Sequence, residues 1–398
     1  MLQVQVTEFV VLLSVAAIAG TVLRRLPIPP AVVLAVVGLL AGLAFGPLHI
    51  DLSPRLLLFV ILPGLLFEAA FNLRGDILRT NLAVAITLAT GGVLVTTVVA
   101  GLLGHWVLGL SIPLALIFGA VVSPTDPVSV LAVFRRLGVP SRLANLVEAE
   151  SLFNDGTGAV LFTVAVAAAG AGGLSLGSGA LELLRLAGGG CALGLAIGFV
   201  LSRVTIHIDD VQVEITLTAV AAYGGYLLAD SLGTSGILCV VMAGLVLGNY
   251  GRPRGMSART QHEVGVFWDY VTFLLNTAVF LIIGLDVPRA DLLQVIWLIL
   301  PSALVVLLAR AVSVYGLLAL LRPFHRSVGW RWQHLITWSG LRGAVAIALL
   351  LTLTGSSFAR LRGLVYGTVL LSLVVQGTTM GPLAGRLLHR RMGPPAVD

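Results

Sequence analysis

The 398-residue chain contains no lysine, and only 11% of its residues are charged, against roughly 25% in soluble domains. A soluble fold is excluded by this shortage of charge together with 58% hydrophobic residues and a mean hydropathy of +1.04. Two cysteines, Cys191 and Cys239, lie inside apolar stretches, so neither a disulfide scaffold nor a cysteine metal site is indicated. Apolar runs of about twenty residues recur along the chain. We therefore expect an all-α polytopic membrane protein.

Charged, polar and Pro/Gly clusters divide the chain into thirteen predicted transmembrane spans. The predicted spans are 8–23, 29–47, 54–73, 81–108, 112–134, 143–168, 181–202, 212–230, 234–250, 264–285, 292–320, 331–354 and 363–388. The first run has no basic residues before it, which favours a first transmembrane helix over a cleaved signal peptide.

The arginines predict how the chain is oriented. All 24 basic residues are arginine and 18 residues are acidic, which gives a net charge of +6. With the N-terminus outside the cell, cytoplasmic segments hold seventeen arginines, external loops five, and spans the remaining two. Basic residues concentrate in cytoplasmic loops. We therefore predict a multi-pass protein of the cell (inner) membrane with a cytoplasmic C-terminus, and the basic charge requires no nucleic-acid partner.

Two spans are interrupted. In the fifth span, Pro124 and Pro127 remove two helical donors, which predicts an unwound segment. In the twelfth span, the polar, glycine-containing patch 339–343 interrupts an apolar run. The two breaks match if the chain is built from two inverted six-helix repeats, one at about 8–168 and one at about 212–388, joined by a linking helix at about 181–202. Matched breaks in inverted halves indicate a transporter's binding site.

The predicted loops are short, the longest being 169–180 and the arginine-rich 251–263. We therefore expect a single transmembrane domain over 1–398 with no soluble domain. A phosphate-binding GxxxxGK[ST] motif is absent, so transport would be driven by an ion gradient.

Five acidic residues fall well inside predicted spans: Glu68, Asp126, Glu148, Glu150 and Asp155. A carboxylate deep in a bilayer costs at least about 2.5–3.5 kcal/mol, so it normally faces a cavity, a partner or an ion. The alternative for each is an ion pair that holds helices together, which suits Glu148 and Glu150 better than the two aspartates.

The sixth span presents one polar face. At 100° per residue, Ser151 and Asp155 share that face with Asn154 at its edge, and Glu150 lies about 140° away from Asp155. An intramembrane arginine, Arg342 or Arg310, is the expected partner of Glu150 because each charge needs a counter-ion. The glycines after Asp155 permit close approach of a neighbouring backbone, such as the unwound stretch of the fifth span.

These candidate ligands are all oxygens. A Thr125 carbonyl, the Asp126 and Asp155 carboxylates, the Ser151 hydroxyl and the Asn154 or Glu68 oxygens suit a hard monovalent cation, whereas zinc, iron or copper would require His or Cys. Burial favours the neutral form of a carboxyl group. A carboxylate in such a site holds either a proton or a cation, and this competition couples the two fluxes.

Several motifs carry a resemblance to a known family. SPTDPV (123–128), FRRLGVPSRL and EAESLFNDGTG (148–158) resemble family 1 of the monovalent cation:proton antiporters, the NhaP-type sodium/proton exchangers. Similar matches are LPGLLFEAAFNL (62–73), FLIIGLDV (280–287) and WSGLRGAVAIAL (338–349), so the resemblance runs in order from about residue 60 to 350.

The resemblance implies a thirteen-helix inverted-repeat fold, a homodimer, and exchange of sodium or lithium for protons by movement of a core bundle against a dimerisation scaffold. It implies that Asp155 binds the cation and the proton, that Asp126, Thr125, Ser151, Asn154 and Glu68 complete or support the site, and that Glu150 pairs with Arg342 to hold the broken helices together. Asn154 stands where electrogenic relatives carry a second aspartate, and no lysine is present, which favours electroneutral exchange. The motif departs from the common EGES only in reading EAES.

We therefore expect a sodium/proton antiporter with a part in pH homeostasis and sodium transport, without enzymatic activity and without a cofactor. A potassium/proton antiporter with the same site stays open, because a list of ligands does not set cation choice. An ion channel would show a pore-lining repeat between subunits, and an intramembrane serine protease would need a serine–histidine or similar pair at mid-depth. Neither feature is visible in the sequence.

Overall fold

The computed structural model describes residues 14, 17–18, 28–45, 56–170, 176–285, 287, 289–322 and 328–388. All regular elements in these ranges are helices, which confirms the all-α class. Among the described residues, eight helices are long and apolar enough to cross a membrane, and the shorter apolar helices are Pro30–Gly42, Leu57–Asn72 and Ile112–Val121. The predicted first span, 8–23, lies almost wholly outside the described residues, so the count of thirteen stays a prediction.

One group of helices, which we call the scaffold, packs around α13. The scaffold comprises η2 (Leu57–Ile61), α4 (Leu62–Asn72), α10 (Leu176–Thr205), α11 (Val211–Ala219), η4 (Val220–Gly224), α12 (Gly225–Ser231), α13 (Gly236–Val246), η5 (Leu247–Gly251), α14 (Arg252–Gly255) and α15 (Ala258–Leu285). Its η segments are π-helical and continue the helices beside them. The helix α2 (Pro30–Phe45) packs along α15.

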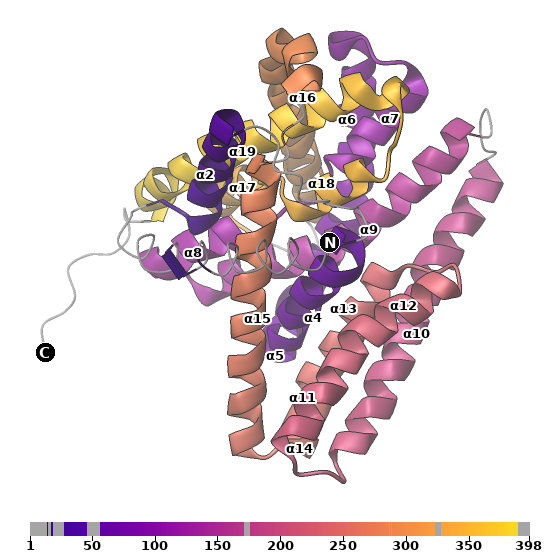
Figure 1. Ribbon diagram of the computed structural model, residues 1–398, viewed down its shortest axis with the longest axis vertical. Coiled ribbons are helices and arrows are strands. Elements are labelled where there is room, and N and C mark those ends of the chain that lie inside the picture. The colour runs from indigo at the N-terminus through magenta and orange to yellow at the C-terminus, as the bar shows by residue number, and fades with distance from the viewer. Residues whose placement is uncertain are drawn as a thin grey trace, which may run out of the picture.

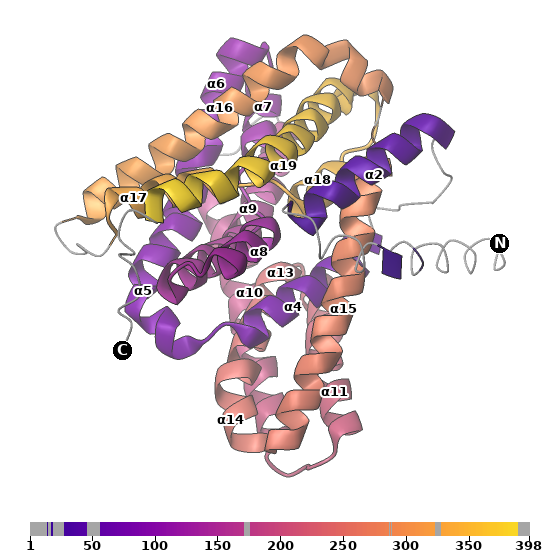
Figure 2. The same cartoon turned by 90° about the vertical axis from the view of Figure 1, so that its left-hand side faces the viewer.

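The second group, the core bundle, packs around α9 and α16. It comprises α5 (Gly75–Thr87), η3 (Leu88–Gly92), α6 (Val93–Leu108), α7 (Ile112–Val121), α8 (Val128–Leu137), α9 (Ser141–Gly170), α16 (Arg289–Leu321), α17 (Trp330–Trp338), α18 (Ala344–Leu351), η6 (Ser356–Phe358) and α19 (Ala359–Leu388). Figures 1 and 2 show α11 and α14 of the scaffold at one end of the molecule, and α6, α7 and α16 towards the other.

Both predicted helix breaks are present. The fifth span ends its first helix at Val121 and resumes at Val128, so Pro124 and Pro127 lie in the unwound segment. The other break separates α17 from α18 and covers 339–343. Proline explains the first break, since it removes backbone donors and crowds the preceding turn. The second break contains no proline, and Gly340 and Gly343 are the residues that let another chain segment approach it.

The predicted loop 251–263 is wrong in its extent. The four residues of α14 occupy its start, and α15 already begins at Ala258. The sequence pattern marked where apolar residues stop, but a helix continues past the bilayer wherever its residues favour helix. Arginine, glutamine and glutamate are good helix formers, and this segment contains all three types.

Glycine lets α4 pack closely on the scaffold. A Cβ on Gly244 would lie 2.8 Å from Ala70 Cβ and 3.0 Å from Phe67 O, and a Cβ on Gly248 would contact the Phe71 backbone. Because helices in lipid gain little from the hydrophobic effect, such small-residue contacts supply much of their association. The last turn of α4 is therefore held against α13 and η5.

Candidate functional site

The site lies where the two broken spans meet. The Asp126 backbone N–H donates to the Leu341 carbonyl at 2.8 Å, which links the two unwound segments directly. A Cβ on Gly343 would fall within contact distance of the Asp126 side chain, so this position requires glycine. The Asp126 carboxylate turns back on its own chain, and its Oδ1 accepts from the Val128 N–H at 2.9 Å. Asp126 thus lies just before α8, accepts from the first N–H of that helix, and stands beside the second break.

Two residues of α9 hold the unwound Thr125. Asn154 Oδ1 accepts from the Thr125 N–H at 3.1 Å, and Asn154 Nδ2 donates to Thr125 Oγ1 at 2.8 Å. Ser151 Oγ donates to the Thr125 carbonyl and lies 3.2 Å from Thr125 Oγ1. All three residues are buried. Because a broken helix leaves backbone groups unpaired, these side chains replace the lost helical hydrogen bonds.

Glycine also lets the fifth span reach α9. A Cβ on Gly158 would collide with the Pro124 ring. This agrees with the expectation that the glycines after Asp155 admit the unwound stretch.

A cavity of about 450 Å³ runs up to this crossing. Its walls come from α4, the two breaks, α8, α9, α15 and α18. Asp126 and Asp155 both line it, so two ionised carboxylates here would repel each other. No residue in the described part of the chain forms a hydrogen bond with the Asp155 carboxylate, which is 8% exposed. A cation or a proton at this point would relieve the repulsion between the two carboxylates.

The predicted residues come together but divide into two sets. Asp155, Asp126, Thr125 and Glu68 line the cavity. Ser151 and Asn154 do not, and their polar atoms are bonded to Thr125. The sequence predicted Ser151 on the helix face of Asp155 with Asn154 at its edge, but it could not tell that both would contact Thr125. Glu68 is held by its own helix, because Asn72 Nδ2 donates to Glu68 Oε1 at 2.8 Å.

The cavity wall contains further charged and polar residues that the sequence did not indicate as site residues. Glu148, Arg135, Asp269, Thr272 and Asn276 all line the cavity. The last three lie at positions i, i+3 and i+7 of α15, a spacing that puts them on one helix face. That polar stripe in an otherwise apolar span was a usable signal. Arg135 and Asp269 are exposed, so they mark the open end of the cavity.

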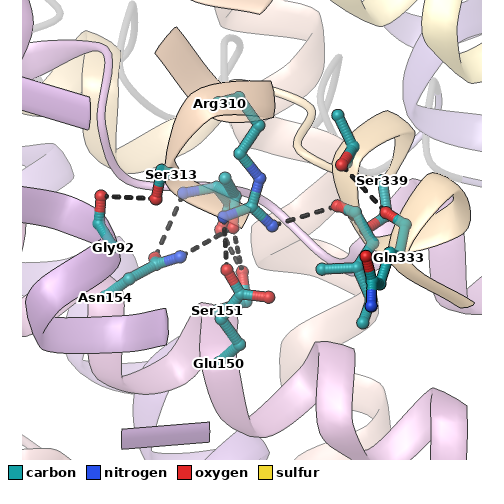
Figure 3. Close-up of polar contacts among 11 residues, drawn as sticks. Gly92, Glu150, Ser151, Asn154, Arg310, Ser313, Gln333 and Ser339 are labelled. Atoms are coloured by element: carbon teal, nitrogen blue, oxygen red, sulfur yellow. Dashed lines mark hydrogen bonds and ion pairs between the residues drawn. The ribbon is translucent and has the colours of Figure 1, made fainter. Parts of the chain in front are cut away.

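The expected pairing of Glu150 with Arg342 is wrong. Glu150, which is 1% exposed, forms its ion pair with Arg310 of α16, and Arg310 Nη2 also donates to the Ile336 carbonyl of α17 at 3.0 Å. Figure 3 shows Arg310 lying between Glu150 and the second break. Gly340 leaves room for this path, since a Cβ there would lie 2.9 Å from Arg310 Nε. Arg310 was the other arginine that the helix geometry had left open.

Arg342 is fully buried, and its guanidinium nitrogens have no hydrogen-bond partner within the described residues. Its backbone N–H donates to Ser372 Oγ of α19 at 3.2 Å. A buried guanidinium without an acceptor is unfavourable. Arg310, and not Arg342, therefore links α9 to α16 and α17.

Three comparisons place the chain among known proteins. A family profile described as "Sodium/hydrogen exchanger, transmembrane" matches residues 11–386. The Na(+)/H(+) antiporter ApNhaP of Aphanothece halophytica is 40% identical over 389 residues, covering 96% of this chain and 74% of that protein. The Na(+)/H(+) antiporter NhaP of Pseudomonas aeruginosa is 36% identical over 358 residues, covering 85% and 82%.

Among solved structures, the sodium proton antiporter MjNhaP1 from Methanocaldococcus jannaschii at pH 8 has the same fold. Its TM-score is 0.80 at 24% identity, and the alignment covers 97% of this chain and 99% of that one. The family match, the similar relatives and the shared fold agree with the crossing of two broken spans beside buried carboxylates. The chain therefore belongs to the sodium/hydrogen exchanger family, in the NhaP-type branch of monovalent cation:proton antiporters.

Proposed function

We propose that this protein exchanges sodium or lithium for protons across the membrane. The observation that carries the proposal is the position of Asp155 and Asp126 at one cavity beside the crossed breaks. The named activity of the relatives ApNhaP and NhaP supports the same conclusion. The cation and the proton are substrates, and the chemistry requires no cofactor and no enzymatic step.

Competition at Asp155 couples the two fluxes in this proposal. Deprotonated Asp155 binds a cation together with Asp126 and an oxygen of Thr125, and protonated Asp155 releases it. Alternating access follows if the core bundle moves against the scaffold when Asp155 carries a cation or a proton, and does not move when Asp155 is charged and carries neither. The electrostatic reason is that an unpaired carboxylate is costly to move through a low-dielectric region.

The surrounding residues have supporting roles. Ser151 and Asn154 fix Thr125, Glu68 adds negative charge to the cavity wall, and Glu150 with Arg310 ties α9 to the second broken span. Asn154 is neutral and its amide is hydrogen-bonded to Thr125, so it adds no second charge beside Asp155. We therefore propose electroneutral exchange of one cation for one proton.

We also propose that the open end of the cavity faces the cytoplasm of a cell with the protein in its inner membrane. Arg135 and Asp269 mark that end, and both lie next to segments that the arginine bias assigns to the cytoplasm. The two inverted repeats and a homodimeric assembly belong to the same proposal, with the scaffold as the face between protomers.

The competing functions differ in what they need at the site. A potassium/proton antiporter uses the same ligands with a larger coordination sphere, so only measurement separates it. An intramembrane serine or cysteine protease needs a base such as histidine beside its nucleophile, and the described residues that line the cavity include no histidine or cysteine. A channel would conduct a cation without moving protons.

One experiment tests these alternatives together. The purified protein in proteoliposomes, loaded with a pH-sensitive dye, is challenged in turn with lithium, sodium and potassium chloride. We expect dye responses to sodium and lithium. A response to potassium alone selects the potassium antiporter, and cation flux without proton movement contradicts antiport.

A further inference from the structure

The connection between α4 and α5 is one place where the chain passes between the scaffold and the core bundle. The last turn of α4 packs on α13 and η5, whereas α5 packs on α9 and η3. The connection itself is short, because α4 ends at Asn72 and α5 begins at Gly75. Any movement of the core bundle against the scaffold must therefore be accommodated within very few backbone torsions here.

Asn249 of η5 holds both ends of this connection. Its Nδ2 donates to the Leu73 carbonyl at 3.0 Å, and its Oδ1 accepts from the Gly75 N–H at 2.7 Å. The same Nδ2 donates to the Leu245 carbonyl at 3.0 Å, which anchors the side chain to its own helix. A single amide thus bridges a scaffold helix to the residue before Arg74 and to the residue after it.

This bridge constrains the torsions of Arg74. The distance between the Leu73 oxygen and the Gly75 nitrogen depends on the φ and ψ angles of Arg74, which are −73° and 117°. Turning α5 relative to α4 changes those angles, and the two atoms then no longer fit one amide group. At least one of the two hydrogen bonds must break when the connection bends.

The scaffold side of the connection is fixed by a second set of contacts. Arg252 Nη1 donates to Asn72 Oδ1 at 3.2 Å, and the Arg252 guanidinium lies 5.2 Å from the centre of the Phe71 ring. Asn72 in turn donates to Glu68 in the cavity wall. The end of α4 is therefore immobilised up to Leu73, which leaves Arg74 as the place where bending occurs.

We propose that Asn249 is a positioning residue that latches the α4–α5 connection in the conformation seen here, with the cavity open at its Arg135 and Asp269 end. The latch releases when the core bundle moves. The inference deepens the proposed alternating access and names a residue that neither the sequence motifs nor the cation site had indicated.

The test measures how often the cavity is open. Phe273 lines the cavity and is 41% exposed, so Phe273→Cys places a thiol there in a Cys191→Ala, Cys239→Ala background. A membrane-impermeant maleimide added to the side where the cavity opens reports the open population through its labelling rate. Asn249→Leu keeps the side-chain size, removes the hydrogen bonds, and lies at an exposed position where folding tolerates change.

We expect Asn249→Leu to slow labelling at least about twofold, because the substitution removes hydrogen bonds that form only in the open state and so lowers the population of that state. Asn249→Asp keeps the acceptor for the Gly75 N–H and should recover part of the rate. Gly75→Pro removes that donor and also adds ring atoms against the Asn249 amide, since a Cβ at this position would lie 2.8 Å from Asn249 Oδ1. It should therefore displace the amide and act like Asn249→Leu. Proline suits the first position of a helix, and the extended Arg74 suits the residue before it.

Asp210→Ala is the matched control. Asp210 is also exposed and also accepts two backbone N–H bonds, but both lie within the first turn of α11. Labelling of Asn249→Leu at the wild-type rate overturns the latch. A decrease in labelling rate in Asp210→Ala as large as that in Asn249→Leu also overturns it. Sodium-driven proton movement is measured on the same samples. Its absence in the wild type would reject the proposed function, while the labelling rates would still decide the latch.

Discussion

The amide of Asn154 bonds twice to Thr125, accepting from its backbone N–H and donating to its hydroxyl. Thr125 is the residue at which the fifth span is unwound, and Asn154 directly precedes the aspartate that lines the cavity. The pair therefore joins the broken backbone to the helix that carries Asp155. Its geometry makes the effect of each nearby substitution predictable.

Asn154→Asp should retain exchange. The new carboxylate still accepts from the Thr125 N–H, and the Thr125 hydroxyl reverses its role and donates instead. The added negative charge beside Asp155 should make exchange generate current under a sodium gradient. Recordings on solid-supported membranes check this. A wild-type protein that already produces current would contradict electroneutral exchange.

Asp155→Asn should abolish cation-dependent proton movement in proteoliposomes and leave the fold intact, because the amide neither titrates at neutral pH nor carries a charge for the cation. Thermal unfolding followed by fluorescence should show a midpoint close to that of the wild type. Exchange at the wild-type rate from this variant would remove Asp155 from the mechanism.

Breaking the Glu150–Arg310 pair should destabilise the protein. Removing one partner of a buried ion pair typically costs about 3–5 kcal/mol, so Arg310→Met should lower the thermal midpoint strongly. Arg342→Met should cost much less, because Arg342 has no hydrogen-bond acceptor for its guanidinium among the described residues.

The double variant Glu150→Gln, Arg310→Met sharpens this comparison. It should be less destabilised than the two single changes added together, since neither charge is then left alone. A larger decrease in the thermal midpoint for Arg342→Met than for Arg310→Met would show that Arg342 is the true partner of Glu150.

Gly343→Ala should impair exchange, because the added methyl group would overlap the Asp126 side chain. A shift of either group disturbs the bond between the Asp126 N–H and the Leu341 carbonyl. Gly316→Ala on α16 is the matched control, since a Cβ there meets nothing within 4 Å. In a helix, that control change should be neutral or stabilise by about 0.5–1 kcal/mol. Equal exchange rates in the two variants would refute the requirement for glycine at 343.

Asp269→Asn should raise the sodium concentration needed for half-maximal exchange without lowering the maximal rate. Asp269 lies at the exposed end of the cavity, where negative charge concentrates cations before they reach Asp155. The effect should shrink at high ionic strength, because salt screens exposed charges. A change that is independent of ionic strength would argue for direct coordination instead.

The sequence alone determined the membrane class, the break at Pro124 and Pro127, and the shared face of Ser151 and Asp155. Each of these follows from neighbours along one helix, where hydropathy, proline chemistry and the 100° rotation per residue are sufficient. Both interruptions were also visible as local patterns, but their contact through the Asp126 N–H and the Leu341 carbonyl came only from the structure.

Only the tertiary structure decided which arginine meets Glu150, which polar groups turn to Thr125 instead of the cavity, and that Asp269 of α15 joins the cavity wall. Periodicity states which side of a helix a residue occupies. It does not state how far that helix is shifted or rotated against its neighbours. Arg310 reaches Glu150 because Gly340 leaves space between α16 and the second break, a contact between segments distant in the chain. Such offsets arise from packing the whole bundle at once.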